Sequence, residues 1–418
     1  MQQGNRVFVL NMRGKALMPT TQRKARILLK EKKAKIVKYN PFTIQLNYPT
    51  GENKQEVNIG IDTGAKNIGI AITSNDKVFY KAEVELRQDI SSNIYSKSIY
   101  RRSRRNRKTR YRKPRFLNRK NSIRKDRFSP TMISKYQSHI REIDFIKSIL
   151  PISQLVLETG TFDTHLLKNP SLANPKIRHW GYQKGILYDY DNIKAYILTR
   201  DKYTCQCCKT KKGTLHVHHI IYRSQGGSDE ESNLITLCET CHKKLHKGEL
   251  RDFESKLEGK RKGQLKHATQ MNSIRIQLLK HYPDAIETFG YITKANRQAL
   301  SLSKDHYIDA CVIASCGKPF NIKSKTYYKR VVGNGTRILA KFRKVPIHLD
   351  RGKIRGFRRY DKVKYRGKEY FIYARSKTGN FCVTDIFGNK PDFGIKTLGS
   401  VNPKYLNKID SGGTVLYA

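Results

Sequence analysis

Cysteines and histidines gather between residues 205 and 246 with the spacing of a metal site. Two C-x-x-C pairs stand at Cys205 and Cys208 and at Cys238 and Cys241. In a reducing compartment this spacing is typical of a tetrahedral structural zinc site rather than of disulfides. The separation between the two pairs exceeds that of an ordinary zinc ribbon, so we expect a folded segment between them.

Four further side chains near these pairs are not needed by a structural zinc. They are His218, His219, Asn233 and His242. Hydrolysis of a phosphodiester needs a base on the attacking water and a cation on the leaving oxygen. His219 can be the base, because histidine titrates near neutral pH, while His218 and His242 can hold one divalent metal and Asn233 can orient His219. A zinc ribbon that only binds nucleic acid is the alternative for this segment.

The order of these residues resembles the HNH (ββα-metal) nuclease family. The family pattern is a D/H-H-I string, then N-L, then C-x-x-C-H. It is matched here by His218, His219, Ile220, Asn233, Leu234, Cys238, Cys241 and His242. The resemblance implies one catalytic Mg²⁺, with Mn²⁺ as the alternative because a neutral histidine stands where many members have aspartate. His216 and His246 are expected at the surface or behind the ligands, without an assigned role.

A second set of reactive residues is acidic and spread along the chain. Asp62 ends an apolar strand in VNIGIDTGAKNIGIA, and Glu158 ends another in QLVLETGTF. Asp309 follows His306 by one helical turn in KDHYIDACVIA, so the two share a helix face. Carboxylates on apolar elements must be paired or metal-bound. Together they could hold two Mg²⁺ ions that clamp the attacking and leaving oxygens, with His306 acting on the water.

The charge of the chain points to a polyanionic partner. Its 418 residues include 84 Lys+Arg against 34 Asp+Glu, a formal net charge of +50. Nucleic acid is the leading candidate, because each bound cation releases counterions from phosphates. An anionic membrane surface is the other option, but we find no apolar run of about 18 residues and no signal peptide at the N-terminus. We therefore expect a cytoplasmic protein without a membrane partner.

The densest run of cations lies at residues 97–127, between segments that read as folded. The run lacks proline and glycine up to Arg112, which is consistent with a helix. Its place between folded segments favours an ordered helix that binds phosphates. The predicted nucleic-acid-binding residues are Arg101, Arg102, Arg104, Arg105, Arg107, Lys108, Arg110 and Arg112.

Hydrophobic periodicity gives the elements that position these residues. We expect an N-terminal unit with the strand VFVLN, a helix over 20–35 and two strands around Pro41. Residues 57–86 read as a three-stranded meander. The remaining predictions are helices over 132–150, 265–281 and KDHYIDACVIASC, strands at QLVLETGTF and ETFGYITK, a linker at KNPSLANPK, and a β-rich, barrel-like unit beyond about residue 325.

The order of these parts resembles the IscB family, transposon-associated RNA-guided endonucleases related to the type II CRISPR effector nucleases. The resemblance covers nearly the whole chain. It rests on Asp62, an arginine-rich helix, Glu158, the Cys/His module and the His306–Asp309 pair, in that order. The N-terminal unit resembles the family's PLMP domain, with Ala16 in place of the first proline.

That resemblance implies an α/β multidomain fold. An RNase H-like RuvC domain would be split in three and carry an inserted HNH domain, a small N-terminal α+β domain and a C-terminal β-rich domain. The implied divisions are 1–56 PLMP-like, 57–96 RuvC-I, 97–127 bridge helix, 128–165 RuvC-II, 166–264 HNH with linkers, 265–325 RuvC-III, and 326–418 for contact with RNA and the target-adjacent motif.

The resemblance also implies the activity and the partners. A monomeric protein would bind a noncoding guide (omega) RNA and cut double-stranded target DNA. HNH would cut the guide-paired strand and RuvC the displaced strand, while base pairing reads the sequence. The implied cofactors are two Mg²⁺ at RuvC, one Mg²⁺ or Mn²⁺ at HNH, a structural Zn²⁺ and the guide RNA.

Three other functions remain open on the residues. An unguided nuclease, such as a resolvase or restriction-type enzyme, would carry the same motifs. A non-catalytic binder with a relic site would share them too. The string around Asp62 also occurs in actin-like phosphotransferases, but that function leaves the Cys/His module unexplained.

Overall fold

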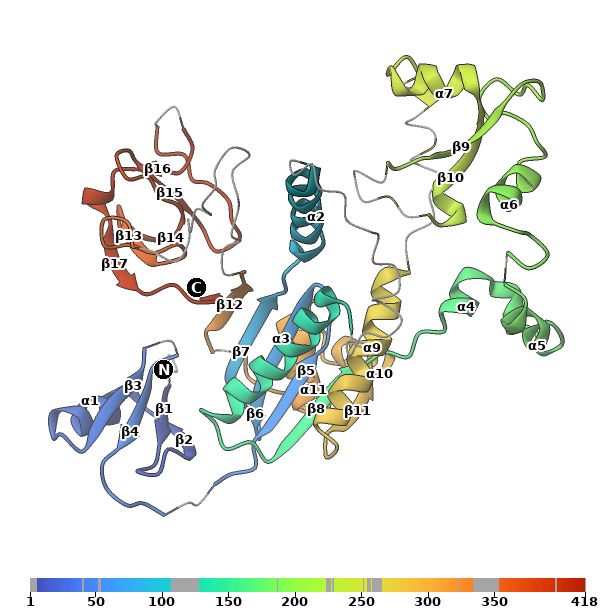
Figure 1. Ribbon diagram of the computed structural model, residues 1–418. Coiled ribbons are helices and arrows are strands. Elements are labelled where there is room, and N and C mark those ends of the chain that lie inside the picture. The colour runs from blue at the N-terminus through green and yellow to red at the C-terminus, as the bar shows by residue number, and fades with distance from the viewer. Residues whose placement is uncertain are drawn as a thin grey trace. The chain divides into compact units, whose positions relative to one another are not determined.

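The computed structural model divides the chain into two compact units. One unit comprises Met1–Thr161 and Gln270–Ala418, and the other Phe162–Thr269 (Figure 1). The residues it describes are 6–39, 41–51, 54–106, 128–185, 187–222, 227, 229–250, 252–253, 257, 265–322, 324–333, 353–394 and 397–417. Within these ranges, we find no helix with the length and apolar character needed to cross a membrane.

The first unit begins with a small four-stranded sheet and one helix. The sheet order is β2-β1-β4-β3. Helix α1 buries Ala25 and Leu28 against it, and Thr21 caps the first turn by accepting a bond from the Lys24 amide. The helix is shorter than predicted, because the chain turns through Lys32 with φ 55° and enters β3. The elements are β1 (Val7–Leu10), β2 (Ala16–Thr20), α1 (Gln22–Lys30), β3 (Ala34–Lys38) and β4 (Thr43–Leu46).

A seven-stranded sheet forms the centre of the same unit. Its order is β11-β8-β5-β6-β7-β12-β18. The predicted meander is confirmed as antiparallel β5, β6 and β7. Strands β8, β11 and β12 join it in parallel, β8 beside β5, β11 beside β8 and β12 beside β7. The strands are β5 (Asn58–Asp62), β6 (Asn67–Ser74), β7 (Lys77–Glu85), β8 (Gln154–Thr159), β11 (Ile286–Phe289), β12 (Thr326–Val331) and β18 (Val415–Tyr417).

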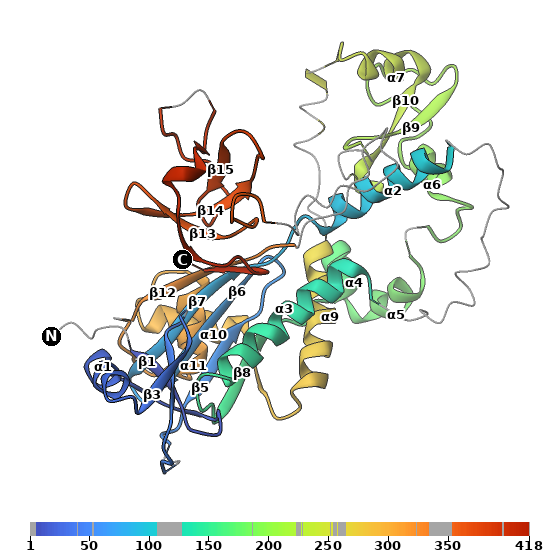
Figure 2. The same cartoon turned by 60° about the vertical axis from the view of Figure 1, so that its left-hand side comes forward.

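Helices cover both faces of this sheet (Figures 1 and 2). On one face, α3 (Pro130–Lys147) and α9 (Lys266–His281) contribute Ile143 and Ile274 to the main apolar core. On the other face, α11 (His306–Ala314) packs Ala310 and Cys311 against β6 and β7. The sheet is therefore buried on both sides, as its nearly continuous apolar strands predict.

Two sequence predictions in this part are wrong. The strand expected through ETFGYITK ends at Phe289, and α10 (Gly290–Ala299) begins at the next residue. The linker expected at KNPSLANPK contains a short 3₁₀ helix (Pro170–Ala173) and the start of α5 (Pro175–Gln183). Asn169 and Asn174 each accept an amide hydrogen bond at the start of one of these helices, and a proline follows each of them.

The C-terminal β-rich segment forms a separate five-stranded sheet. Its order is β16-β15-β14-β13-β17, so in the part of the chain placed by the structure β16 and β17 are its edges. Val363, Ile372 and Phe381 lie in its core. The strands are β13 (Lys362–Tyr365), β14 (Lys368–Ala374), β15 (Phe381–Thr384), β16 (Ser400–Val401) and β17 (Asn407–Asp410).

The second unit contains two paired strands followed by a helix. Strand β9 (Leu215–His219) pairs antiparallel with β10 (Leu234–Cys238), and α7 (Glu239–His246) follows directly. Helices α4 (Thr164–Lys168), α5 and α6 (Ile193–Arg200) belong to the same unit. The apolar residues of β10 and α7 share their core with three of the predicted cysteines.

Candidate functional sites

Acidic residues form a row across the centre of the seven-stranded sheet. Asp62 on β5 lies opposite Glu158 on β8 and opposite Gly69 on β6, and Gly69 lies opposite Glu83 on β7. Directly opposed residues of paired strands project to the same face of a sheet. The register therefore brings Asp62 and Glu158 together, as the sequence predicted. It also adds Glu83, a carboxylate that no sequence motif marked.

Helix α11 lies unusually close to this row because two glycines face it. A side chain at Gly60 would collide with the backbone of Ala310, and one at Gly69 would overlap the carbonyl of His306. This close approach places His306 Nδ1 2.6 Å from Asp62 Oδ2. Two of the predicted site residues, His306 and Asp62, are thus in direct contact, although they are far apart in the sequence.

Asp309 reaches the same region but is paired with a cation. Its Oδ1 lies 2.8 Å from Arg297 Nε on α10, an ion pair whose N–H is not aligned as a hydrogen bond. Burial and the neighbouring Asp62 raise the pKa of Asp309, and Arg297 opposes that shift. Arg297 was not predicted from the sequence, because its role depends on how α10 packs.

Glu158 has the environment of a carboxylate that is missing a partner. Its Oε2 is buried and finds no hydrogen bond among the residues that the structure places. Burial, reinforced by the charge of Asp62, raises the pKa of Glu158 to about 7. An orphaned buried carboxylate oxygen beside a second carboxylate fits a divalent cation, which prefers oxygen ligands. The carboxylate oxygens of Asp62, Glu158 and Asp309 nevertheless do not all lie within 4.8 Å of one another.

One group that does converge contains the predicted zinc ligands. The sulfur atoms of Cys205, Cys208, Cys238 and Cys241 all lie within 4.8 Å of one another. Cys208 Sγ is 3.7 Å from Cys238 Sγ, and all four are free thiols. Cys238 also caps α7, because its sulfur accepts the amide of Cys241 at 3.5 Å. Four thiols at this spacing fit a tetrahedral zinc ion.

The second converging group consists of histidines. His218, His242 and His246 have ring nitrogens within 4.8 Å of one another. His218 is buried and its Nε2 has no hydrogen-bond partner in the described ranges. Burial, together with the charges of His242 and His246, lowers the pKa of His218 to about 4. It is therefore neutral at neutral pH, which is the form that binds a metal.

His246 was left without a role by the sequence. It lies four residues after His242 on α7, so the two rings share one helix face. Their Nε2 atoms are 3.3 Å apart. The i, i+4 spacing of two histidines was the signal that could have identified it. His216 packs its ring against His242 with centroids 5.2 Å apart, consistent with a supporting place.

The predicted base, His219, ends the strand that carries His218. Its Nε2 lies 2.7 Å from Oδ1 of Asp229, a largely exposed carboxylate. Asn233 is buried and holds the chain just beyond His219: its Oδ1 accepts from the Ile221 amide at 2.9 Å, and its Nδ2 donates to the Ile221 carbonyl at 3.1 Å. These bonds fix the backbone next to His219, whereas a direct bond from Asn233 to His219 stays a prediction.

The predicted phosphate-binding cations lie on and beyond α2 (Ile90–Asn106), which begins earlier than the predicted boundary at residue 97. Arg101 and Arg102 are exposed on this helix. Arg104 and Arg105 belong to its last turn. The other four predicted cations, Arg107, Lys108, Arg110 and Arg112, lie outside the described residues.

Two family models match the chain. The RRXRR protein family matches residues 7–185, and the HNH endonuclease family matches residues 205–248. The first match includes Asp62, Glu158 and helix α2. The second includes all four clustered cysteines and the three clustered histidines.

Curated proteins and a solved structure are similar over parts of the chain. Anaredoxin from Nostoc sp. is 36% identical over 64 residues, which are 15% of this chain and 84% of that protein, so this segment belongs to the same family. The type IV methyl-directed restriction enzyme EcoKMcrA from Escherichia coli is 37% identical over 62 residues, 13% of this chain and 22% of that enzyme.

The solved structure is Streptococcus thermophilus Cas9 in complex with the AGAA PAM. The similarity covers 60% of this chain and 32% of that chain, with 12% identity and a TM-score of 0.33, which is too low to support a conclusion. The family matches carry the assignment. An RRXRR domain followed by an HNH domain identifies the chain as an IscB/Cas9-like HNH nuclease.

Proposed function

We propose that the protein is an RNA-guided DNA endonuclease that cuts the two strands at two different sites. The HNH module would cut the guide-paired strand, and the acidic row, as a RuvC-type site, would cut the displaced strand. The proposal is supported by two sets of candidate ligands in two compact units. One unit brings the rings of His218, His242 and His246 together, and the other carries Asp62 in contact with His306.

At the HNH module, His219 would take the proton of the attacking water. Its contact with Asp229 stabilises the imidazolium that forms, and Asn233 keeps the adjacent backbone in place. His218 and His242, with His246, would hold the divalent ion, Mg²⁺ or Mn²⁺. When bound, that ion supplies positive charge for the phosphate oxygens. The four cysteines would hold zinc and keep α7 against the two strands.

At the acidic row, Asp62, Glu158 and Asp309 would hold Mg²⁺, and His306 would position or deprotonate the water. The contact between His306 Nδ1 and Asp62 orients the imidazole ring. The orphaned oxygen of Glu158 supports the assignment, because a buried carboxylate needs a cationic partner. Arg297 would stabilise the charged form of Asp309.

The guide RNA is supported by the charge of the chain. A net charge of +50 exceeds what a short duplex requires, and exposed arginines on α2 can contact phosphates. In this proposal the protein binds backbone and shape, and base pairing supplies sequence specificity.

The test is a strand-resolved cleavage assay with the guide RNA that co-purifies with the protein. A matching duplex carries a different label on each strand. We expect the His219→Ala variant to cut only the displaced strand. The Asp62→Asn variant should cut only the guide-paired strand. The exposed residues His281 and Asp76 supply matched controls, His281→Ala and Asp76→Asn, which should cut both strands. Loss of the same strand in both site variants would refute the two-site assignment.

An unguided nuclease is the second candidate, favoured by the similarity to a restriction enzyme. The two are separated by treating the protein with RNase before adding DNA. Guided cutting stops after this treatment and returns when guide RNA is added back. Cutting that persists without RNA would favour the unguided enzyme.

A further inference from the structure

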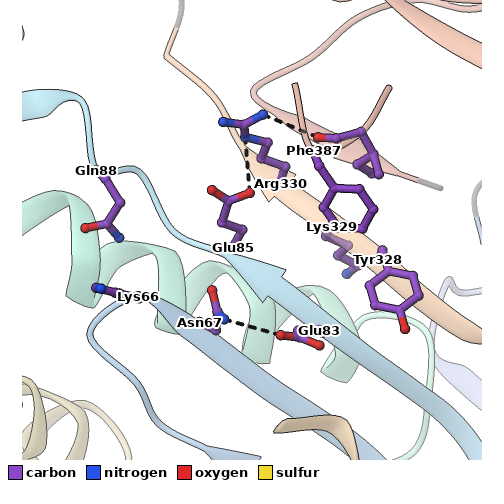
Figure 3. A pocket seen from close by; sticks show the side chains of 10 residues that line it. Lys66, Asn67, Glu83, Glu85, Gln88, Tyr328, Lys329, Arg330 and Phe387 are labelled. Carbon is purple, nitrogen blue, oxygen red and sulfur yellow. Dashed lines mark hydrogen bonds and ion pairs between the residues drawn. The ribbon is translucent and has the colours of Figure 1, made fainter. Parts of the chain in front are cut away.

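A pocket with a volume of about 330 Å³ lies on the sheet beside the acidic row (Figure 3). Its walls come from β6, β7 and β12, and from the segments that follow β5, β7 and β15. The residues that matter most are Lys66, Asn67, Glu83, Tyr328 and Phe387. This volume is at the lower end of small-ligand pockets, about 300–1,000 Å³, and suits one nucleotide rather than a duplex.

The pocket continues the row of residues that contains the acidic site. Tyr328 on β12 lies opposite Glu83 on β7, Glu83 lies opposite Gly69, and Gly69 lies opposite Asp62. Each step between opposed residues is about 5 Å, so Tyr328 is roughly 15 Å from Asp62 on the same face of the sheet. A nucleic-acid strand bound at Asp62 would therefore pass over or beside the pocket.

Two aromatic rings offer a surface for stacking. Phe387 is 58% exposed and meets Tyr328 edge to face, with centroids 6.0 Å apart. More than half of the Phe387 side chain is thus open to solvent. Nucleobases stack on such rings without regard to sequence, because every base has a π face.

The other walls carry the polar groups that a nucleotide requires. Asn67 Nδ2 donates to Glu83 Oε1 at 3.3 Å, so an amide and a carboxylate stand together within reach of a base edge. Lys66 is exposed at the rim and can contact a phosphate. Burial raises the pKa of Glu83, consistent with a carboxyl group held in a partly enclosed site.

The turn that carries Phe387 is held against β12 by Arg330. The Arg330 guanidinium pairs with Glu85 Oε2 at 3.2 Å and donates to the Ile386 carbonyl at 3.5 Å. Gly388 permits this approach, because a side chain there would collide with the guanidinium. The aromatic wall is therefore formed before any ligand binds, which limits the entropy lost on binding.

We propose that this pocket receives one unpaired base of the DNA strand that is cut at the acidic row. Phe387 stacks on the base, and Lys66 contacts a neighbouring phosphate. A paired base cannot enter, since its edge and both its faces are already occupied in the duplex. The inference rests on the proposed function, because it assigns the pocket to the displaced strand.

The test combines abasic nucleotides with variants of Phe387, in the full protein bound to its guide RNA. Abasic sites are moved one position at a time along the displaced strand. One position near the cut should slow displaced-strand cleavage by about 5- to 10-fold, the lower part of the range for stacking one base. Phe387→Ala should slow cleavage of the intact strand by the same factor, and the abasic site should then cause no further slowing. Phe387→Tyr should restore both the wild-type rate and the sensitivity to the abasic site.

Two controls separate stacking from general damage. Tyr39 is 72% exposed in the N-terminal sheet unit, so Tyr39→Ala should behave as wild type. Cleavage of the guide-paired strand should be unchanged in every variant. If no abasic position depends on Phe387, or if the sensitive position lies in the flanking duplex or the RNA, the pocket assignment is wrong.

A second measurement does not require cleavage. Single-stranded DNA with one 2-aminopurine is bound to the protein without metal, and its fluorescence is followed. Quenching that is lost in Phe387→Ala and kept in Phe387→Tyr supports the pocket even if the protein cuts no DNA. Cleavage of both strands without Phe387-dependent quenching would retain the proposed function and overturn the pocket.

Discussion

At the scale of single residues, three buried polar atoms without hydrogen-bond partners fall into two groups, according to whether other ligand-type side chains lie beside them. Glu158 Oε2 and His218 Nε2 are buried and unpartnered in the described ranges, and each stands beside other ligand-type side chains. His139 Nε2 is also buried and unpartnered, but it lies in the apolar core on α3. The first two fit ligands, and the third affects stability.

His139 gives a prediction for the pH dependence of stability. Burial, with a contribution from the charge of Lys135, lowers the pKa of His139 to about 4, although its Nδ1 donates to the Lys135 carbonyl at 2.9 Å. An unfolded histidine has a pKa of about 6.5. Below that pH the unfolded chain binds a proton that the folded chain does not, so stability falls as the pH drops towards 4.

We expect this histidine to remove about 2 kcal/mol of unfolding free energy between pH 7 and pH 5. Urea unfolding at the two pH values, followed by hydrogen exchange of α3 and its neighbouring strands, measures the loss. His139→Gln should reduce the pH dependence by that amount, whereas His281→Gln, at an exposed position, should leave it unchanged. An identical pH dependence in wild type and His139→Gln would contradict the prediction.

At the scale of elements, the sequence predicted the strands that carry the site better than the residues between them. The apolar runs around Asp62 and Glu158 identified β5 and β8, because nearly continuous apolar runs fit a strand that is buried on both faces. Glu83 could not be recognised, since its place depends on the register of β6 and β7. Gly290 was missed as a helix start for a similar reason: the preceding strand pairing decides where β11 ends.

The histidine site was predictable to a similar degree. The strings H-H-I and C-x-x-C-H marked His218, His219 and His242 as candidate site residues. Asp229 was not predicted, because nothing in the chain sequence shows which side chain of the following loop returns to His219. Local motifs therefore give the candidate ligands, and the fold determines which residues lie beside them.

A substitution at Gly69 tests whether the close contact between α11 and β6 positions His306. An added methyl group would overlap the carbonyl of His306 and push α11 away from β6. We expect Gly69→Ala to cost about 1–3 kcal/mol of unfolding free energy, as overpacking does. A displacement of His306 by about 1 Å would slow displaced-strand cleavage by roughly 10²-fold.

The same strand-resolved assay measures this effect. Cleavage of the guide-paired strand should be unchanged, because Gly69 and the HNH module belong to different compact units. Gly51→Ala is the matched control, since a side chain at Gly51 would meet nothing within 4 Å. Equal rates in Gly69→Ala and Gly51→Ala would show that the close contact of α11 with β6 does not position His306.

At the scale of the whole molecule, the two units have separate apolar cores, and the chain as a whole carries a large excess of positive charge. The core around Ile59 and Ile143 belongs to the first unit, and the core around Leu237 and Cys241 to the second. The net charge of +50 opposes the compact state through self-repulsion unless a polyanion neutralises it. In the proposed complex, binding of a long RNA should therefore also stabilise the folded protein.

This charge predicts a steep dependence of nucleic-acid binding on salt. With about 6–10 phosphate contacts, affinity should fall by roughly 10³–10⁵ between 50 and 200 mM salt. Because a long structured RNA offers more phosphates than a short duplex, the slope of log affinity against log salt should be steeper for the co-purifying RNA than for a 20-base-pair DNA of unrelated sequence. Filter binding across a salt series measures both slopes. A flat profile for the RNA would mean that the basic residues do not bind its phosphates, and the guide-holding role of the charge would have to be abandoned.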